Sequence, residues 1–229
     1  MRSILLIMLF VCGCNQLCSQ AAEIHHFAYS VEIPDNAPAL WVRWNLSPAN
    51  LTNKVANRAD YFFADDPSTP SKEIDNAYSH SGFDRGHLCP SADMRFSVVA
   101  QKECFYLTNI IPQTPALNRG TWERLESLCR EWCKTRGTLL IYAGAIYPPD
   151  IENKRFLHGS SIEIPSECWK VITCATDTKI YAIGFRMPNA PSLDLNPFRY
   201  VVPVSTLPTP RATTPVTENM QWWATASAR

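Results

Sequence analysis

Proline sets the strongest limit on how this chain can fold. Eighteen prolines stand against eight glycines in 229 residues. Proline fixes its own φ angle and has no backbone N–H, so it interrupts helices and occupies corners and sheet edges. The sequence therefore predicts a loop-rich fold with rigid corners and not a helical bundle. A hydrophobic share of 46% and a charged share of 18% argue against disorder of the whole chain. The length suits one domain.

One amphipathic helix is predicted from its spacing. Apolar side chains recur at offsets 0, 3, 6, 7 and 10 from Trp122 to Trp132, which places them on one face of a helix. We expect this helix over residues 121–134, with Gly137 as its stop. Residues 64–82 are polar and predict a surface loop. Short apolar or alternating runs predict strands at 41–44, 105–107, 138–142, 168–174 and 180–185.

The N-terminus is typical of an export signal. Arg2 is followed by an apolar run, Ile4 to Val11, which is too short to span a membrane because spanning needs about 20 residues. Cleavage after Ala21 would release a secreted or periplasmic protein. Lipoprotein processing would instead remove residues 1–13 and leave Cys14 as a lipid anchor at the cell envelope. A buried N-terminal helix is the third alternative. We expect an exported protein with no integral membrane span.

The expected organisation is a signal over residues 1–21, or 1–13 for a lipoprotein. A lead-in or tether over 22–39 then precedes one domain over 40–208, and a tail over 209–229 carries Trp222 and Trp223, which can dock. Acidic and basic side chains number 21 each. Removing residues 1–21 leaves 20 basic and 21 acidic side chains, a net charge of −1. Generic polyanion-binding domains are usually basic, so a chain of this composition that binds a polyanion would have to place its positive charge locally.

Six of the nine cysteines lie beyond the leader: Cys89, Cys104, Cys129, Cys133, Cys168 and Cys174. An even number in an exported protein permits disulfides, while the lack of a Cys-x-x-Cys pair argues against zinc. Two cysteines at i and i+4 of a helix have Cβ atoms about 5–6 Å apart, beyond the roughly 3.5–4.5 Å of a disulfide. We therefore expect no Cys129–Cys133 bond. No turn separates Cys168 from Cys174, and Cys89–Cys104 is the bridge that we expect.

Three blocks contain the residues suited to chemistry: Phe83-Asp84-Arg85-Gly86-His87-Leu88, then Asn109-Ile110-Ile111-Pro112-Gln113, then Leu117-Asn118-Arg119-Gly120-Thr121-Trp122-Glu123-Arg124-Leu125-Glu126. A histidine titrates near neutrality and can take a proton from water; its alternative is a structural role in a turn. Asn118 offers a hard oxygen for Mg²⁺, or caps the helix that follows. Glu126 lies about two turns further along, where it can accept from a metal-bound water or be a solvated surface residue.

In this order the three blocks resemble the sugar-non-specific endonucleases, the family that includes mitochondrial endonuclease G. The resemblance runs from about Leu40 to Pro208. It takes in Arg58, Phe62 and Asp65 upstream, and Trp169-Lys170-Val171-Ile172 and Met187-Pro188-Asn189 downstream. It implies an α+β fold: a ββα-metal core with a central, mainly antiparallel sheet flanked by helices.

The resemblance also implies roles for single residues. His87 is the general base, Asn118 holds Mg²⁺ (with Mn²⁺ as a substitute), and Glu126 contacts a metal-bound water. Arg85 and Arg58 hold the substrate phosphate, since a guanidinium matches phosphate oxygens. Asp84 fixes the turn or pairs with an arginine, and Gly86 allows a tight backbone beside the base. Asn109 shapes the strand end or the adjoining loop.

The implied activity is hydrolysis of DNA and RNA through phosphate contacts, leaving 5′-phosphate ends. No base-reading helix or aromatic stacking platform is visible, so we expect little sequence preference. Two other functions compete: a nucleic-acid-binding protein with weak turnover on the same fold, and a phosphodiesterase for small or lipid substrates. Nothing in the sequence predicts an oligomeric state.

Overall fold

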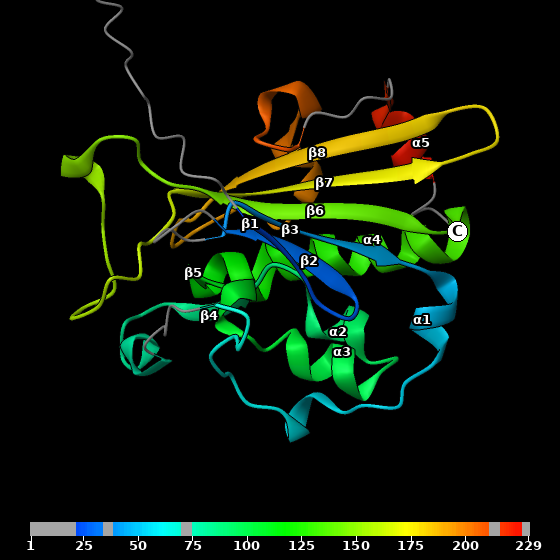
Figure 1. Cartoon of the computed structure of the whole chain (residues 1–229). Helices are drawn as coiled ribbons and strands as arrows, with labels where there is room; N and C mark the ends of the chain where they lie inside the picture. Colours follow the sequence, from blue (N-terminus) through cyan, green and yellow to red (C-terminus); the bar gives the residue numbers. More distant parts are fainter. Residues whose placement is uncertain (1–21, 34–38, 70–74, 211–215, 226–229) are drawn as a thin grey trace, which may run out of the picture.

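A large sheet forms the centre of the molecule in the computed structural model, which describes residues 22–33, 39–69, 75–210 and 216–225 (Figure 1). Its strands follow the order β1-β2-β3-β6-β7-β8-β10, with β9 beside β8. All neighbours are antiparallel except β10, which runs parallel to β8. The strands are β1 Ala22–His25, β2 Tyr29–Ile33, β3 Trp41–Leu46, β6 Leu139–Ile146, β7 Glu167–Ala175, β8 Ile180–Pro188, β9 Val201–Val202 and β10 Thr217–Glu218.

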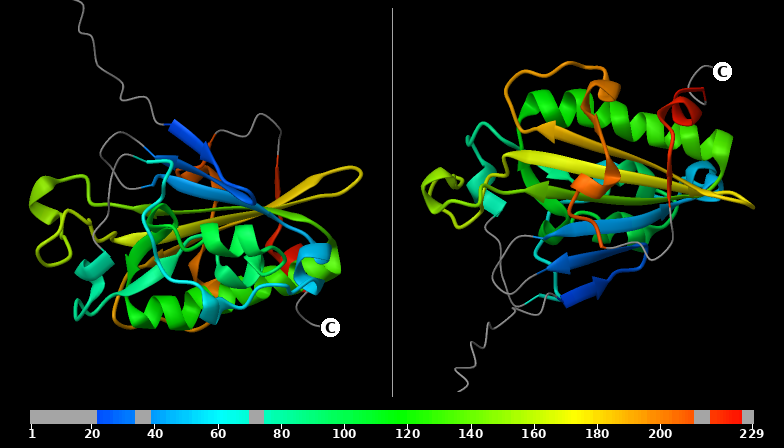
Figure 2. Two further views of the ribbon diagram at one scale, coloured as in Figure 1. Left: turned by 60° about the horizontal axis from the view of Figure 1, so that its bottom comes forward. Right: turned by 90° about the horizontal axis from the view of Figure 1, so that it is seen from above.

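Helices α2, α3 and α4 cover one face of this sheet (Figures 1 and 2). The main core lies between α4 and the sheet, where Trp132 packs with Ile172 and Phe185. The expected α+β fold with a mainly antiparallel sheet flanked by helices is confirmed. The helices are α1 Pro48–Thr52, α2 Ser91–Met94, α3 Val98–Glu103, α4 Glu123–Arg136 and α5 Met220–Ala224, with short turns η1 Arg58–Asp60, η2 Asp75–Tyr78, η3 Leu107–Asn109, η4 Leu117–Trp122, η5 Ile151–Asn153, η6 Pro197–Tyr200 and η7 Val204–Thr206.

The predicted amphipathic helix is α4. It spans Glu123–Arg136 and ends at Gly137, whose φ of 99° suits glycine. Its buried residues include Leu125, Cys129 and Trp132, three members of the predicted stripe. The strands expected at 41–44, 138–142, 168–174 and 180–185 are also present, as β3, β6, β7 and β8.

Both ends of the described chain pack more extensively than the sequence suggested. Strands β1 and β2 extend the sheet from β3, with Tyr29 and Val31 buried. This corrects the expectation of a lead-in over residues 22–39, because residues 29–33 alternate apolar and polar side chains as a half-buried strand does. In the predicted tail, Trp223 is fully buried against Trp132, and Trp222 stacks on Tyr181 at 4.1 Å between ring centroids.

Two loop regions differ from expectation. Residues 105–107 form no strand: Tyr106 makes a single bridge to Ala64, and a 3-10 turn begins at Leu107. The apolar run there reflects burial and not sheet pairing, since a short apolar run does not distinguish the two. The predicted surface loop also has buried members, and Asp66 lies 3.0 Å from His26, which joins it to the β1–β2 hairpin.

All six cysteines of the described chain are free thiols, and all are buried. The absence of a Cys129–Cys133 bond and of a Cys168–Cys174 bond is as predicted. The expected Cys89–Cys104 bridge is wrong, because the Cys104 thiol donates instead to the carbonyl of Gln101 at 3.1 Å. The predicted export signal, with Cys14, lies outside the described residues. In the described part of the chain no helix has the length and apolar character needed to cross a membrane.

Candidate active site

A two-stranded hairpin outside the main sheet carries the histidine of the motif. Strand β4 (Asp84–His87) pairs antiparallel with β5 (Ile110–Gln113), and His87 lies opposite Ile110. The turn η4 and helix α4 follow β5 in the chain. Trp122 Nε1 donates to the carbonyl of His87 at 3.2 Å, which fastens the start of α4 to the end of β4. Two strands and a helix therefore form one unit around His87.

Gly86 is required by the close packing of this hairpin. A Cβ atom at Gly86 would lie 2.3 Å from Oε1 and 2.5 Å from Cγ of Gln113. Gln113 cannot move away freely, since it is fully buried and its Nε2 contacts the sulfur of Cys168 at 3.5 Å. Glycine thus allows the tight backbone that the sequence predicted directly before His87.

His87 lies between two aromatic rings. Its ring centroid is 5.0 Å from that of Phe105 and 5.5 Å from that of Phe63. The residue is only 8% exposed, and its Nε2 atom has no hydrogen-bond partner among the described residues. Burial, helped by the positive charge of Arg58, lowers the pKa of His87 to about 3. The imidazole is therefore neutral at neutral pH and has a nitrogen free to accept a proton.

Two arginines lie on the same aromatic rings. The guanidinium of Arg58 is 5.3 Å from the centroid of Phe105, and that of Arg85 is 5.5 Å from the centroid of Phe63. Such contacts hold a cation in place without neutralising it. Two positive charges from distant segments are thus gathered beside His87, which supplies local positive charge in a chain of zero net charge.

Asp84 orients Asn118. The amide nitrogen of Asn118 donates to Asp84 Oδ2 at 2.9 Å, so the amide oxygen points away from that carboxylate. Arg119 donates twice to Asp84, at 2.6 and 2.8 Å. Burial raises the pKa of Asp84, but the hydrogen bonds from Arg119 and Asn118 outweigh it and lower the pKa overall. Asp84 is thus an arginine-paired carboxylate, as predicted.

The capping alternative for Asn118 does not hold. The residue lies inside η4, where its backbone N–H donates to the carbonyl of Thr114 at 2.9 Å, and Ala116 occupies the N-cap position. Asn109 has the loop-shaping role that was expected. It is fully buried, and its side chain accepts from the N–H of Cys89 and donates to the carbonyls of Cys89 and Cys104.

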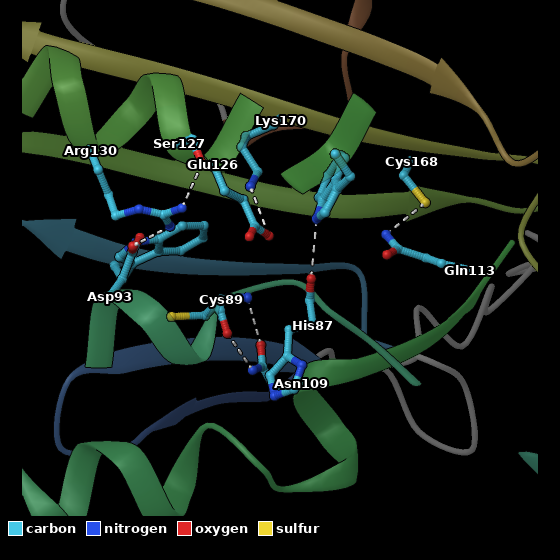
Figure 3. A network of polar contacts seen from close by, with 12 residues as sticks. His87, Cys89, Asp93, Asn109, Gln113, Glu126, Ser127, Arg130, Cys168 and Lys170 are labelled. Carbon is cyan, nitrogen blue, oxygen red and sulfur yellow. Dashed lines mark hydrogen bonds and ion pairs between the residues drawn. The ribbon is translucent and has the colours of Figure 1, made fainter. Parts of the chain in front are cut away.

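Glu126 is not a solvated surface residue. Its side chain is 12% exposed, and its Oε1 atom lies 3.9 Å from Nζ of Lys170 on β7 (Figure 3). Burial raises the pKa of Glu126 to about 7, although the charges of Lys170 and Arg130 oppose the rise. The structure therefore places His87, Asn118 and Glu126 on one β4–β5–η4–α4 unit.

Residues 15–210 match the model of the DNA/RNA non-specific endonucleases. The chain belongs to this family.

Other members of the family resemble the chain over most of its length. It is 34% identical over 163 residues to the mitochondrial nuclease EXOG of Danio rerio, which covers 66% of this chain and 47% of that protein. It is 31% identical over 184 residues to the mitochondrial endonuclease G of Homo sapiens, covering 76% of this chain and 62% of that protein. The chain thus spans less than two thirds of either relative.

A crystal structure of the EndoG/EndoGI complex has a similar fold, with a TM-score of 0.73 and 25% identity. The match covers 80% of this chain and 81% of that chain. The similarity therefore includes most of the sheet and helices that position the β4–β5–η4–α4 unit.

The sequence did not reveal every side chain of this candidate site. Phe63 and Phe105 gave no signal, since nothing in their spacing ties them to His87. Lys170 did leave a signal: it shares a face of β7 with Cys168 and Ile172, which belong to the main core. A lysine at a core-facing position is rare unless its charge is paired.

Proposed function

We propose that this protein is a metal-dependent endonuclease that hydrolyses phosphodiester bonds of DNA and RNA with little sequence preference. The observation that carries the proposal is a buried, neutral His87 with an unpartnered Nε2, set between rings that also hold Arg58 and Arg85. Such a site supplies a base and two phosphate-binding cations at one place. Membership of the family supports the same activity.

In the proposed reaction His87 accepts a proton from water, and the water oxygen attacks phosphorus in line with the leaving 3′ oxygen. Arg58 and Arg85 hold the phosphate and balance its charge. A phosphate bound beside Arg58 adds negative charge, which raises the pKa of His87 and makes it a stronger base when substrate is present. The products carry 5′-phosphates. Because water is the nucleophile, no 2′-hydroxyl is needed, and phosphate contacts carry no sequence information.

Asn118 would hold the metal through its amide oxygen, which Asp84 leaves free by binding the amide nitrogen. One such hard oxygen fits Mg²⁺, which keeps most of its waters and accepts few protein ligands. Glu126 is suited to accept a hydrogen bond from one of those waters. When bound, the metal neutralises charge on the phosphate and on the leaving oxygen. Mn²⁺ is the expected substitute.

The purified protein is expected to nick supercoiled DNA and degrade RNA with Mg²⁺ or Mn²⁺ and to lose both activities in EDTA. Arg58→Ala and Arg85→Ala should each lower turnover on both nucleic acids, because both residues contact phosphate. Gel assays on matched DNA and RNA substrates measure this. Binding without cleavage in the presence of metal would support the weak-turnover alternative, and preference for a small diester over long DNA would support a phosphodiesterase.

We also propose that the protein acts after export, because residues 1–21 have the sequence of an export signal. An endonuclease with little sequence preference would damage the nucleic acid of its own cell. N-terminal mass spectrometry of the native protein is expected to find either a lipid-modified Cys14 or a chain beginning at Ala22. A mature chain that begins at Met1 would contradict export by either route.

A further inference from the structure

A lysine lies buried beneath the proposed active site. Lys170, in the middle of β7, has no exposed side-chain surface, and its Nζ atom has no hydrogen-bond partner among the described residues. Nζ lies 4.2 Å from the ring centroid of Trp122 and 5.4 Å from that of Trp44. Burying an ammonium group is costly unless its charge is compensated. Its position between two indole rings and a carboxylate therefore calls for a functional explanation.

The carboxylate that faces Lys170 is that of Glu126, with 3.9 Å between Nζ and Oε1. That distance exceeds the range of a direct hydrogen bond, so the interaction is one of charge. In Figure 3 the lysine approaches the carboxylate from the side of the main sheet, and His87 lies on the opposite side. The two indole rings lie within cation–π distance of the amine and hold it in place. Lys170 thus presents a fixed positive charge behind Glu126.

The other charges around Glu126 do not replace Lys170. Asp93 and Glu123 disfavour the ionised carboxylate, while Arg130 favours it less than Lys170 does. Arg130 is also engaged elsewhere, since it donates to Asp93 at 3.2 Å and to Ser127 at 2.9 Å. Lys170 is therefore the leading cationic influence on this carboxylate.

We propose that Lys170 is a positioning residue of the endonuclease: held by Trp122 and Trp44, it favours the ionised form of Glu126 and holds that carboxylate in place between the main sheet and His87. Its effect on turnover rests on the proposed function. The charge coupling between Lys170 and Glu126 does not, and can be measured separately.

Lys170→Met removes the charge and keeps a long apolar side chain. An opposite charge within about 4–6 Å lowers a carboxyl pKa by roughly 1–3 units. Losing it should therefore move the acidic limb of the pH–rate profile to higher pH by about one unit or more. At a pH on the acidic limb, turnover of Lys170→Met should be about tenfold or more below that of the wild type. It should recover in part as the pH is raised.

Two controls separate this role from simple packing. Lys179→Met changes an exposed lysine of the β7–β8 turn and should leave the profile unchanged. In a Glu126→Gln background, Lys170→Met should cause no further shift, because the group on which it acts no longer titrates. A shift of equal size in that background would show that Lys170 acts elsewhere and would overturn the proposal.

Carbon-13 NMR of the glutamate carboxyls, with Glu126 assigned by its loss in Glu126→Gln, tests the coupling without any activity. We expect Glu126 to titrate at higher pH in Lys170→Met than in the wild type, even if the wild type proves to lack nuclease activity. An unchanged titration in a folded variant would overturn the inference.

Where Lys170→Met fails to fold, Lys170→Met/Glu126→Gln should restore folding, because both buried charges are gone. If the double variant also stays unfolded, Lys170 serves packing and the proposal is wrong.

Discussion

Replacing His87 with alanine is expected to lower the turnover of DNA and RNA by about 10²- to 10⁴-fold, the usual cost of losing a general base. The fold should survive. The Trp122 contact uses the backbone carbonyl of residue 87, and the lost side-chain contacts recorded in the structure are those with the rings of Phe63 and Phe105. Single-turnover cleavage rates, with circular dichroism and a thermal melt of the same samples, measure both effects.

His158→Ala is the matched control, because His158 is exposed and lies in the segment between β6 and β7; its turnover should equal that of the wild type.

The pH dependence of the stability of His87→Ala gives a second readout. Burial lowers the pKa of folded His87 to about 3, against about 6.5 for a free histidine. Between these values the unfolded chain binds the extra proton, so acid destabilises the fold as the pH falls through this range. His87→Ala should lose that part of the acid destabilisation. Undiminished turnover in this variant would remove His87 from the mechanism.

Local sequence patterns predicted those helices and strands whose defining residues lie close together in the chain. The spacing from Trp122 to Trp132 gave α4, because the helical stripe and Gly137 lie within one short segment. The roles of His87, Asn118 and Glu126 were instead predicted from the resemblance of three sequence blocks to a known family, and spacing alone assigned none of them. Residues 29–33 carried a readable alternation, yet their place in the sheet depends on pairing with β3, which is a long-range contact.

The parts of the site that the sequence did not predict come from separate segments. Phe63 precedes η2, Phe105 follows α3 and Lys170 lies in β7, and only the folded chain brings them to His87 and Glu126. The spacing of the residues in the sequence did not predict the environments of His87 and Glu126 either. The low pKa of His87 and the high pKa of Glu126 both arise chiefly from burial, which is a property of the packed core.

Asn118→Ala is expected to lower turnover and to raise the Mg²⁺ concentration needed for half-maximal activity. Changing a residue that merely orients a ligand usually costs about 10- to 100-fold in affinity or activity, so loss of the proposed ligand itself should reach at least the upper end of that range. Asp84→Ala keeps the amide of Asn118 but removes the acceptor that orients it. It should therefore show an intermediate defect of about 10- to 100-fold. Magnesium titrations of activity, with calorimetric titration of metal into the free protein, measure the two effects.

A thermal melt of the same variants separates metal binding from helix stability. Because Asn118 lies inside η4 and Ala116 occupies the N-cap, Asn118→Ala should not show the loss of about 1 kcal/mol that removal of a capping side chain causes. Glu131→Ala, at an exposed position of α4 where the side chain pairs with Lys134, controls for substitution on the same helix and should keep the wild-type response to Mg²⁺. The metal assignment fails if Asn118→Ala is less stable but keeps the same Mg²⁺ dependence as the wild type. The ordering role of Asp84 fails if Asp84→Ala binds metal as the wild type does, since Asn118 would then need no partner to present its oxygen.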